Sequence, residues 1–365
     1  MRIGIDARFL IEQRTGVETY FQEILERLVR LAGPEEYVLF GTGPRRPALP
    51  EGRWSCVEGD TGVAPWMTPR LLRRERLDLF YSPVTALPLA GVRRRIATVY
   101  DLAWHHVPAH YPLAERVSQR LWLGLAGRVA DRIVTISEAT RRDIAGLLPA
   151  ARTEVITPGV DPAFFREIPA PVVAQVRGRY GLEGGYLLVV ATYHPRKNLP
   201  RLIEAYDRFR NRMPGRTRLV IAGRGGADTE RLRERVAVSP YRGDILLPGY
   251  VPREDLPALY AGADLFLLPS RYEGFGMPLA EAMACAVPVL ASDLPIFREV
   301  CGEAALYLDP DDTESIVQGI ERGLRRGPER ETRVRLGIER AGRFRWDASA
   351  LRLRDLFRET AGSAG

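Results

Sequence analysis

The chain contains 365 residues, of which 45% are hydrophobic and 27% charged, a globular composition that is long enough for two domains. Three scattered cysteines are too few for a disulfide framework or a zinc site, and no apolar run approaches the roughly 20 residues that span a bilayer. The formal net charge of +7 suggests an anionic partner: a phosphorylated substrate, a membrane surface or nucleic acid. The N-terminus enters a strand without a signal-peptide pattern, so a cytoplasmic location is expected.

In the first half of the chain, short apolar runs alternate with longer amphipathic segments, which is the pattern of parallel βα units. A proline-rich stretch without strong periodicity follows at residues 168–173, where we place the linker between the domains. Strands are expected at residues 2–6, 36–40, 78–82, 95–100 and 131–136, and helices at 17–31, 113–130 and 137–147.

The alternation then restarts, and each apolar run is again followed by helix-compatible sequence. The predicted fold is therefore α/β, with two doubly wound, Rossmann-like domains and a cleft between them. Ligands bind such sheets at the carboxyl ends of the strands. The expected strands of the second domain lie at residues 186–192, 217–223, 244–249, 263–270 and 287–292.

The segment HPRKNLP, residues 194–200, contains the only lysine among 53 lysine and arginine residues. It follows the strand at 186–192 and precedes a helical pattern, which places Arg196 and Lys197 at the carboxyl end of a strand. Arginine can hold two phosphate oxygens, whereas lysine supplies a compact and movable charge, so the pair suits a phosphate ligand. The alternative is a solvated loop in which the lysine survives by chance.

The stretch LLPSRYEGFGMPLAEAMAC, residues 267–285, predicts a buried strand, a glycine loop and a helix with Pro278 in its first turn. A helix N-terminus favours an anion, and the glycines let a diphosphate approach the backbone. Glu281, one turn into the helix, can accept hydrogen bonds from a ribose diol, whereas Glu273 on the loop can reach the group joined to the terminal phosphate. The alternative for Glu281 is a capping or buried, paired glutamate.

These motifs resemble those of the family 4 retaining glycosyltransferases with the GT-B fold. The run EGFGMPLAEAMA carries the most specific similarity, and others extend along nearly the whole chain: IDARFL, RTGVETYFQEIL, TVYDL, TISEATRRDI, TPGVDPAFF, HPRKN and FRWDASA. The resemblance implies an acceptor-side domain at residues 1–165 and a nucleotide-sugar-binding domain at 166–345. A C-terminal helix at about 346–365 is expected to pack back on the first domain.

By position, the resemblance implies that Arg196 and Lys197 bind the diphosphate, that Glu281 binds the ribose and that Glu273 lies near the donor sugar. Gly16 matches the glycine of a first-domain loop that closes over the phosphates. Further donor-binding positions are Gly274, Phe275, Gly276, Met277, Pro278 and Leu279.

Two positions depart from the family pattern. Many relatives carry a basic residue where this chain has Thr192, so Arg196 and Lys197 must neutralise more of the diphosphate charge. Many also have a His-Asp pair where this chain has Tyr100 and Asp101, and tyrosine cannot exchange protons near neutral pH as histidine can. Candidate groups on the acceptor side are Tyr100, His105 and His106, with Asp101 as a candidate catalytic group, although surface-loop histidines are the simpler interpretation.

The segment DPDD at residues 309–312 is the one notable match to a metal-binding Asp-x-Asp motif, but its place between a strand and a helix is typical of turn and N-cap aspartates. Cations and a helix terminus are available for the leaving diphosphate. We therefore expect no metal site and no cofactor.

The resemblance implies front-face transfer with retention, in which the acceptor hydroxyl passes its proton to the departing phosphate. GDP-mannose is the first-choice donor, because the motifs look most like those of mannosyltransferases that build bacterial surface polysaccharides; a UDP-sugar or dTDP-sugar is the alternative. The acceptor is a glycan or a lipid-linked molecule. Arginine clusters at residues 71–76 and 92–95 suggest peripheral contact with an anionic membrane at the inner face of the plasma membrane, unless they are solvated faces.

Two other classes of function fit parts of the sequence. A UDP-sugar 2-epimerase shares the paired-domain architecture but needs no acceptor. A basic nucleic-acid-binding protein would explain the charge, yet the arginines are spread along the chain without a recognition motif, so no nucleic-acid partner is expected.

Overall fold

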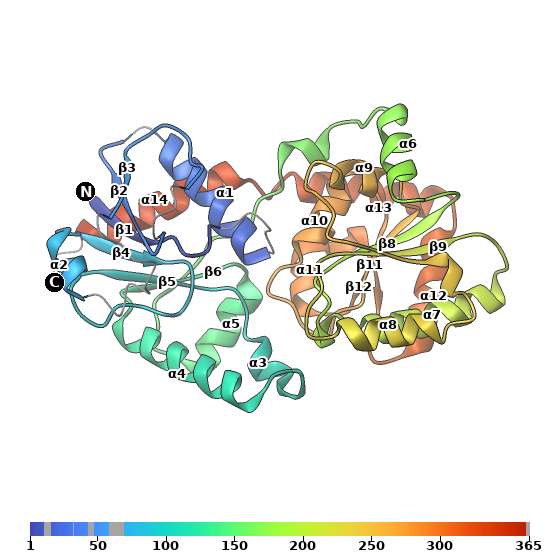
Figure 1. The fold of residues 1–365 in the computed structure, drawn as a ribbon, viewed down its shortest axis with the longest axis horizontal. Coiled ribbons are helices and arrows are strands. Elements are labelled where there is room, and N and C mark those ends of the chain that lie inside the picture. Colours follow the sequence, from blue (N-terminus) through green and yellow to red (C-terminus); the bar gives the residue numbers. More distant parts are fainter. Residues whose placement is uncertain (11–15, 32, 43–46, 58–68, 363–365) are drawn as a thin grey trace. The chain divides into compact units, whose positions relative to one another are not determined.

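A computed structural model describes residues 1–10, 16–31, 33–42, 47–57 and 69–362 of the chain (Figure 1). It divides into two compact units: one comprises Met1–Gly159 and Arg345–Gly365, and the other comprises Val160–Phe344. The division falls earlier in the chain than the predicted boundary at residue 165.

The first unit is built on a seven-stranded parallel sheet with the strand order β3-β2-β1-β4-β5-β6-β7. Its strands are β1 (Arg2–Asp6), β2 (Glu36–Phe40), β3 (Trp54–Cys56), β4 (Leu79–Ser82), β5 (Arg95–Val99), β6 (Arg132–Thr135) and β7 (Thr153–Val155). Its helices are α1 (Gly16–Arg30), α2 (Pro69–Arg74), α3 (Ala103–His106), α4 (Leu113–Val129), α5 (Glu138–Leu147) and α14 (Trp346–Gly362).

Helices cover both faces of this sheet (Figure 1). Leu123 of α4 and Ile144 of α5 share a buried cluster with Val99 and Ile133 of the sheet. Such residues form central parallel strands because β-branched side chains pack well where both faces are buried.

The C-terminal helix α14 packs against α1 in the first unit. Arg27 of α1 donates from Nε to Asp347 Oδ1 at 2.9 Å, and Ser349 Oγ donates to the Thr157 carbonyl at 2.7 Å. The last helix is thereby joined to the unit that contains the N-terminus.

The second unit contains a six-stranded parallel sheet with the order β10-β9-β8-β11-β12-β13. Its strands are β8 (Tyr186–Val190), β9 (Arg218–Ala222), β10 (Ile245–Gly249), β11 (Leu265–Leu268), β12 (Val289–Ser292) and β13 (Ala305–Leu308). Its helices are α6 (Ala170–Arg179), α7 (Leu199–Arg212), α8 (Thr229–Ala237), α9 (Leu256–Ala261), α10 (Met277–Ala284), α11 (Pro295–Cys301), α12 (Thr313–Leu324) and α13 (Pro328–Ala341).

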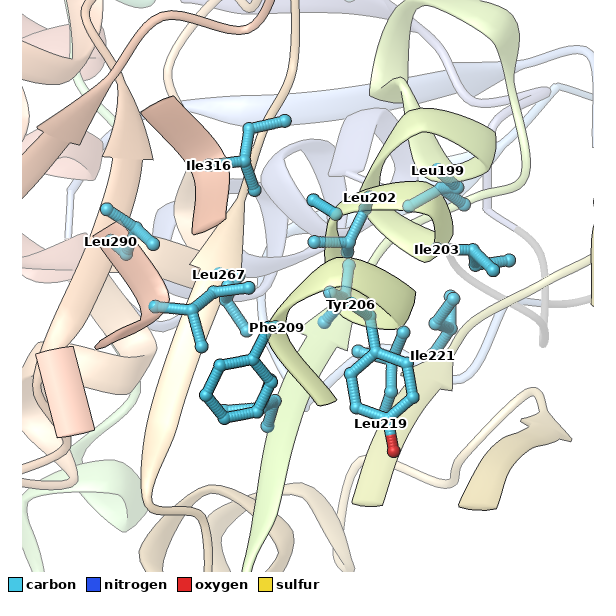
Figure 2. Close-up of a cluster of buried hydrophobic side chains, with 14 of the residues drawn as sticks. Leu199, Leu202, Ile203, Tyr206, Phe209, Leu219, Ile221, Leu267, Leu290 and Ile316 are labelled. Atoms are coloured by element: carbon cyan, nitrogen blue, oxygen red, sulfur yellow. The ribbon is translucent and has the colours of Figure 1, made fainter. Parts of the chain in front are cut away.

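One core cluster fills the space between this sheet and helices α7, α8 and α12. Leu202 and Phe209 of α7 lie over Leu267 of β11, as Figure 2 shows, and Ile316 of α12 belongs to the same cluster. The cluster fixes α7 on the sheet and therefore fixes the β8–α7 loop that precedes it.

The predicted α/β class with two doubly wound sheets is confirmed. The prediction of a linker at residues 168–173 is wrong, because the chain begins helix α6 at Ala170 with Pro171 in its first turn. Proline has no N–H to lose at that position, so a proline-rich start is compatible with a helix. The two edge strands β3 and β7 were not predicted, since three residues each are too few to show a periodic pattern.

Candidate active site

The loop after β8 is held in one conformation by its own side chains. His194 Nδ1 accepts a hydrogen bond from the Arg196 backbone N–H at 3.3 Å within a short 3-10 turn at Pro195–Lys197. Asn198 then adopts the left-handed conformation with φ 60°, which asparagine tolerates better than most residues. Its Nδ2 donates to the Pro310 carbonyl at 2.6 Å, so the loop after β13 supports the loop that carries Arg196 and Lys197.

The loop after β11 ends in the left-handed residue Gly276, whose φ is 92°. A Cβ atom at this position would lie 2.7 Å from the ring of Phe297, so only glycine fits without rearrangement. Helix α10 begins at the next residue, Met277, and the prediction that Pro278 lies in its first turn is confirmed. Phe275 and Leu279 are apolar and buried. The polar groups of residues 274–279 are therefore those of the backbone.

The two loops meet because β8 and β11 are neighbours at the centre of the second sheet. The strand order reverses at this point, and doubly wound sheets bind ligands there. Arg196 Nη1 lies 2.5 Å from Glu273 Oε2, and Lys197 Nζ forms an ion pair with Glu273 Oε1. The structure thus brings three of the predicted site residues into one cluster.

The carboxylate of Glu273 is the centre of this cluster. Only 7% of its side chain is exposed, and Ser270 Oγ donates to Oε1 at 2.8 Å. Burial raises the pKa of Glu273, but the charges of Arg196 and Lys197 and their hydrogen bonds outweigh that effect and lower the pKa to about 2. Glu273 is therefore ionised near neutral pH and cannot act there as a general acid.

The ion pairing between Glu273 and the two cations was not predicted from the sequence, which placed them near different parts of a donor. The contact between Ser270 and Glu273 was not predicted either, although Ser270 ends a predicted strand and precedes Glu273 by three residues. Spacing within one loop could have suggested Ser270, whereas the pairing depends on which strands are neighbours.

Glu281 lies within α10 and accepts a hydrogen bond from the Tyr260 hydroxyl of α9 at 3.0 Å. Burial and then the charge of Glu281 raise the pKa of Tyr260 well above its ordinary value, so the tyrosine remains a proton donor. Tyr260 is a second site residue that sequence reasoning missed.

The candidates in the first unit lie beyond the carboxyl end of β5. The Tyr100 hydroxyl is buried and forms no hydrogen bond with any described residue. Its ring centroid lies 5.4 Å from that of Tyr20. Burial, followed by interactions with Tyr81, Tyr20 and Glu18, raises the pKa of Tyr100 well above its ordinary value. The phenol therefore stays protonated near neutral pH.

The neighbouring candidates have contacts of their own. Asp101 Oδ1 accepts a hydrogen bond from the Ala103 N–H at 2.9 Å, at the start of α3. His106 Nε2 lies 3.0 Å from Asp143 Oδ2 of α5, and His105 packs edge-on against Trp104.

Gly16, the candidate for the loop that closes over the phosphates, is the exposed first residue of α1. Residues 11–15 of that predicted loop lie outside the described residues.

The DPDD segment makes structural contacts at each aspartate. Asp312 caps α12 by accepting from the Glu314 N–H at 2.8 Å, and Asp309 accepts from the Asp311 N–H. Asp311 binds Arg201 at 2.8 Å. In the part of the chain that the structure describes, no group of three or more His, Cys, Asp or Glu side chains could hold a metal ion.

The chain matches two family models and has curated relatives that cover most of its length. Residues 179–340 match the family model described as glycosyl transferases group 1, and residues 14–164 match that of glycosyltransferase family 4. The chain is 32% identical to the O-antigen chain mannosyltransferase B of Escherichia coli, over 91% of this chain and 93% of the relative. It is 31% identical to a GDP-mannose-dependent phosphatidylinositol monomannoside mannosyltransferase of Mycobacterium tuberculosis, over 74% and 71% of the two chains.

Solved structures share the fold at lower sequence identity. Sucrose-phosphate synthase from Thermosynechococcus elongatus superposes with a TM-score of 0.80 at 19% identity, over the full length of both chains. WaaG, a glycosyltransferase involved in lipopolysaccharide biosynthesis, superposes with a TM-score of 0.73 at 16% identity, over 98% and 99% of the chains.

Proposed function

This chain belongs to the group 1 glycosyltransferases of family 4, with the GT-B fold, and from that premise we propose that it is a retaining enzyme of cell-surface polysaccharide synthesis. It transfers a sugar, with mannose as the first choice, from a nucleoside diphosphate donor to a glycan or lipid-linked acceptor. The observation that carries this proposal is the cluster of Arg196, Lys197 and Glu273 where the strand order of the second sheet reverses.

The cluster suits a departing diphosphate because it concentrates positive charge at a strand end. When the bond between the anomeric carbon and the diphosphate oxygen breaks, negative charge develops on that oxygen, and Arg196 and Lys197 stabilise it. The diphosphate competes with Glu273 for both cations, and the N-terminus of α10 adds a weaker attraction for anions.

Retention follows when the acceptor oxygen bonds to the anomeric carbon on the face from which the diphosphate leaves. The acceptor hydroxyl gives its proton to the departing phosphate oxygen, so no enzymic base is consumed. Glu273, ionised and buried, favours the positive charge that develops on the sugar.

On the acceptor side, we assign Asp101 and the nearby Tyr100, His105 and His106 to binding and orienting the acceptor. Tyr100 has a raised pKa and no hydrogen-bond partner among the described residues, so its hydroxyl is suited to donate to or accept from a sugar hydroxyl. A proton-transfer role does not suit it.

GDP-mannose is the proposed donor because both named relatives are mannosyltransferases and one is GDP-mannose-dependent by its name. The test is a thermal-shift series with GDP-mannose, UDP-glucose and dTDP-glucose, followed by a transfer assay with the donor that stabilises the protein. A ligand at 100 times its dissociation constant adds about 2.7 kcal/mol to the free energy of unfolding. GDP-mannose is expected to give the largest shift.

The assays are run with and without excess chelator, because we propose that the cations replace a metal ion. Activity that is lost in chelator and restored by Mg²⁺ or Mn²⁺ would contradict this proposal. Conversion of the donor to an isomer without any acceptor would instead support the 2-epimerase alternative.

Replacing Glu281 by alanine is expected to weaken binding of free GDP by about tenfold, since one charge-assisted hydrogen bond to the ribose is lost. Isothermal titration calorimetry with GDP measures this directly. The control is Tyr260→Phe, which removes the hydroxyl that donates to Glu281 and keeps the carboxylate. Equal GDP affinity in Glu281→Ala and the unmodified protein would mean that Glu281 has a structural role and does not bind the nucleotide.

A further inference from the structure

Helices α7 and α8 lie side by side over one face of the second sheet (Figure 1), and a pocket of about 470 Å³ is lined by residues of both. The loops before these helices and the loop after β11 complete its walls. The donor-binding candidates Arg196, Lys197, Glu273 and Glu281 are not among its lining residues. We call it the α7–α8 pocket; it belongs to the second unit alone and is distinct from the candidate active site.

Two of the four arginines in the wall of this pocket are engaged within the fold. Arg201 pairs with Asp311 at 2.8 Å, and Arg235 pairs with Asp207 at 2.6 Å. Each pair joins a helix to a neighbouring segment. These two arginines therefore hold the wall in shape.

The other two arginines, Arg231 and Arg271, have N–H groups available for a ligand. Arg231 is exposed and forms no ion pair with any described residue. Arg271 directs Nε and Nη2 to Asp311 Oδ1, both at 2.9 Å, and its Nη1 has no partner in the described part of the chain. A guanidinium group carries five N–H donors in a fixed fork, which matches the oxygens of a phosphate group.

Three carboxylates line the same pocket and restrict what it can bind. Asp228 is only 3% exposed, Glu204 is paired with Arg208 at 2.7 Å, and Glu234 is exposed and forms no ion pair with any described residue. Ionised carboxylates only accept hydrogen bonds. They repel a ligand that consists of phosphates alone, such as a nucleic-acid backbone, but they suit hydroxyl groups.

We propose that the α7–α8 pocket binds a phosphorylated monosaccharide. Arg231 and Arg271 hold the phosphate group, and Glu204 and Glu234 accept hydrogen bonds from the sugar hydroxyls. Inorganic phosphate lacks the hydroxyl-bearing part of this ligand, and a neutral sugar lacks the anionic part. Only the choice of mannose as the sugar to be tested rests on the proposed function.

The pocket and the candidate active site share one loop but no side chain. Pro195 and Asn198 line the pocket and flank Arg196 and Lys197 of the ion cluster. The backbone N–H of Arg271 donates to the Arg196 carbonyl at 2.8 Å. A sugar phosphate could therefore also reach the cations of the active site, and the experiment must separate the two sites.

The test is isothermal titration calorimetry of mannose 6-phosphate into the full chain, with GDP in excess to occupy the proposed donor site. Arg231→Gln is expected to weaken binding at least about tenfold, as is Arg231→Gln combined with Arg271→Gln, because charge-assisted hydrogen bonds to the phosphate are lost. Arg231 is exposed, so the single variant should fold normally. The matched control is Arg233→Gln, since Arg233 is an exposed arginine of the same helix that pairs with Glu230 at 2.8 Å and does not line the pocket. It should bind mannose 6-phosphate like the unmodified protein.

Glu234→Ala should affect two ligands differently. Mannose 6-phosphate should bind about fivefold more weakly, because a hydroxyl loses its acceptor, whereas inorganic phosphate should bind at least as tightly, because a repelling charge is removed. Loss of local structure would instead weaken both. This comparison tests whether the carboxylate recognises the sugar.

Three outcomes would overturn the proposal: no binding of mannose 6-phosphate, binding that Arg231→Gln leaves unchanged, or equal affinity for mannose 6-phosphate and inorganic phosphate, which would indicate an adventitious ion only. The titration contains neither a donor sugar nor an acceptor, and Arg231 lies outside the ion cluster. Its result is therefore independent of whether the proposed transfer activity is found.

Discussion

Replacing Lys197 by alanine is expected to lower the turnover of sugar transfer by about 10² to 10³, the usual loss when one preorganised stabiliser of developing charge is removed. Binding of the intact donor should weaken less, because less charge has developed on the diphosphate before the bond breaks. Steady-state kinetics with saturating donor separate the two effects. The carboxylate of Glu273 keeps Arg196 and Ser270 as partners in this variant, so the fold should persist.

Lys197→Arg is the sharper form of the experiment, because every other fixed cationic side chain in this protein is already arginine. If a compact ammonium is needed beside Arg196, the bulkier guanidinium should lower activity at least about tenfold, or roughly 1.4 kcal/mol of transition-state stabilisation. Arg201→Ala is the control, because Arg201 is a cation of the adjacent helix that pairs with Asp311. A fully active Lys197→Arg variant would mean that the single lysine is an accident of composition.

Glu273→Gln is expected to change nucleotide binding and catalysis in opposite directions. Free GDP should bind at least about tenfold more tightly, because the diphosphate no longer competes with a buried carboxylate for Arg196 and Lys197. Transfer should fall by about 10² to 10³, because the charge that favours the cationic sugar is removed. Calorimetry with GDP and steady-state kinetics measure the two quantities.

The same variant should be less stable without nucleotide, since removing one member of a buried ion cluster costs about 3 to 5 kcal/mol. Bound GDP should restore most of that loss. Asp311→Asn is a matched control, because Asp311 also lies between two arginines, Arg201 and Arg271, but its side chain is 64% exposed. Weaker GDP binding by Glu273→Gln would contradict the idea that the carboxylate and the diphosphate compete for the same cations.

The sequence alone determined the class of fold and the family. Apolar runs of four to six residues separated by helix-length amphipathic segments allow little other than parallel βα units, and β1, β2, β5, β8 and β9 lie where the pattern predicts them. The positions of Arg196, Lys197 and Glu273 after their strands follow from the same pattern. Local rules also predicted Pro278 in the first turn of α10.

Other features depended on interactions between distant segments, which a local pattern does not contain. The ion cluster exists because β8 and β11, far apart in the chain, are adjacent in the sheet. Tyr260 reaches Glu281 from another helix. The proline-rich stretch that looked like a linker forms part of α6.

Helix α4 is the clearest example of a feature that the local sequence pattern could not predict. Its helical periodicity was predictable at residues 113–130, and the structure has the helix at Leu113–Val129. Both of its sides carry leucine or valine, so the sequence could not say which side packs on the sheet. Tertiary packing decided this by burying Leu123 and Ala126 and leaving Leu113, Val117 and Leu121 in solvent, because a helix on a sheet can bury only the side that faces it.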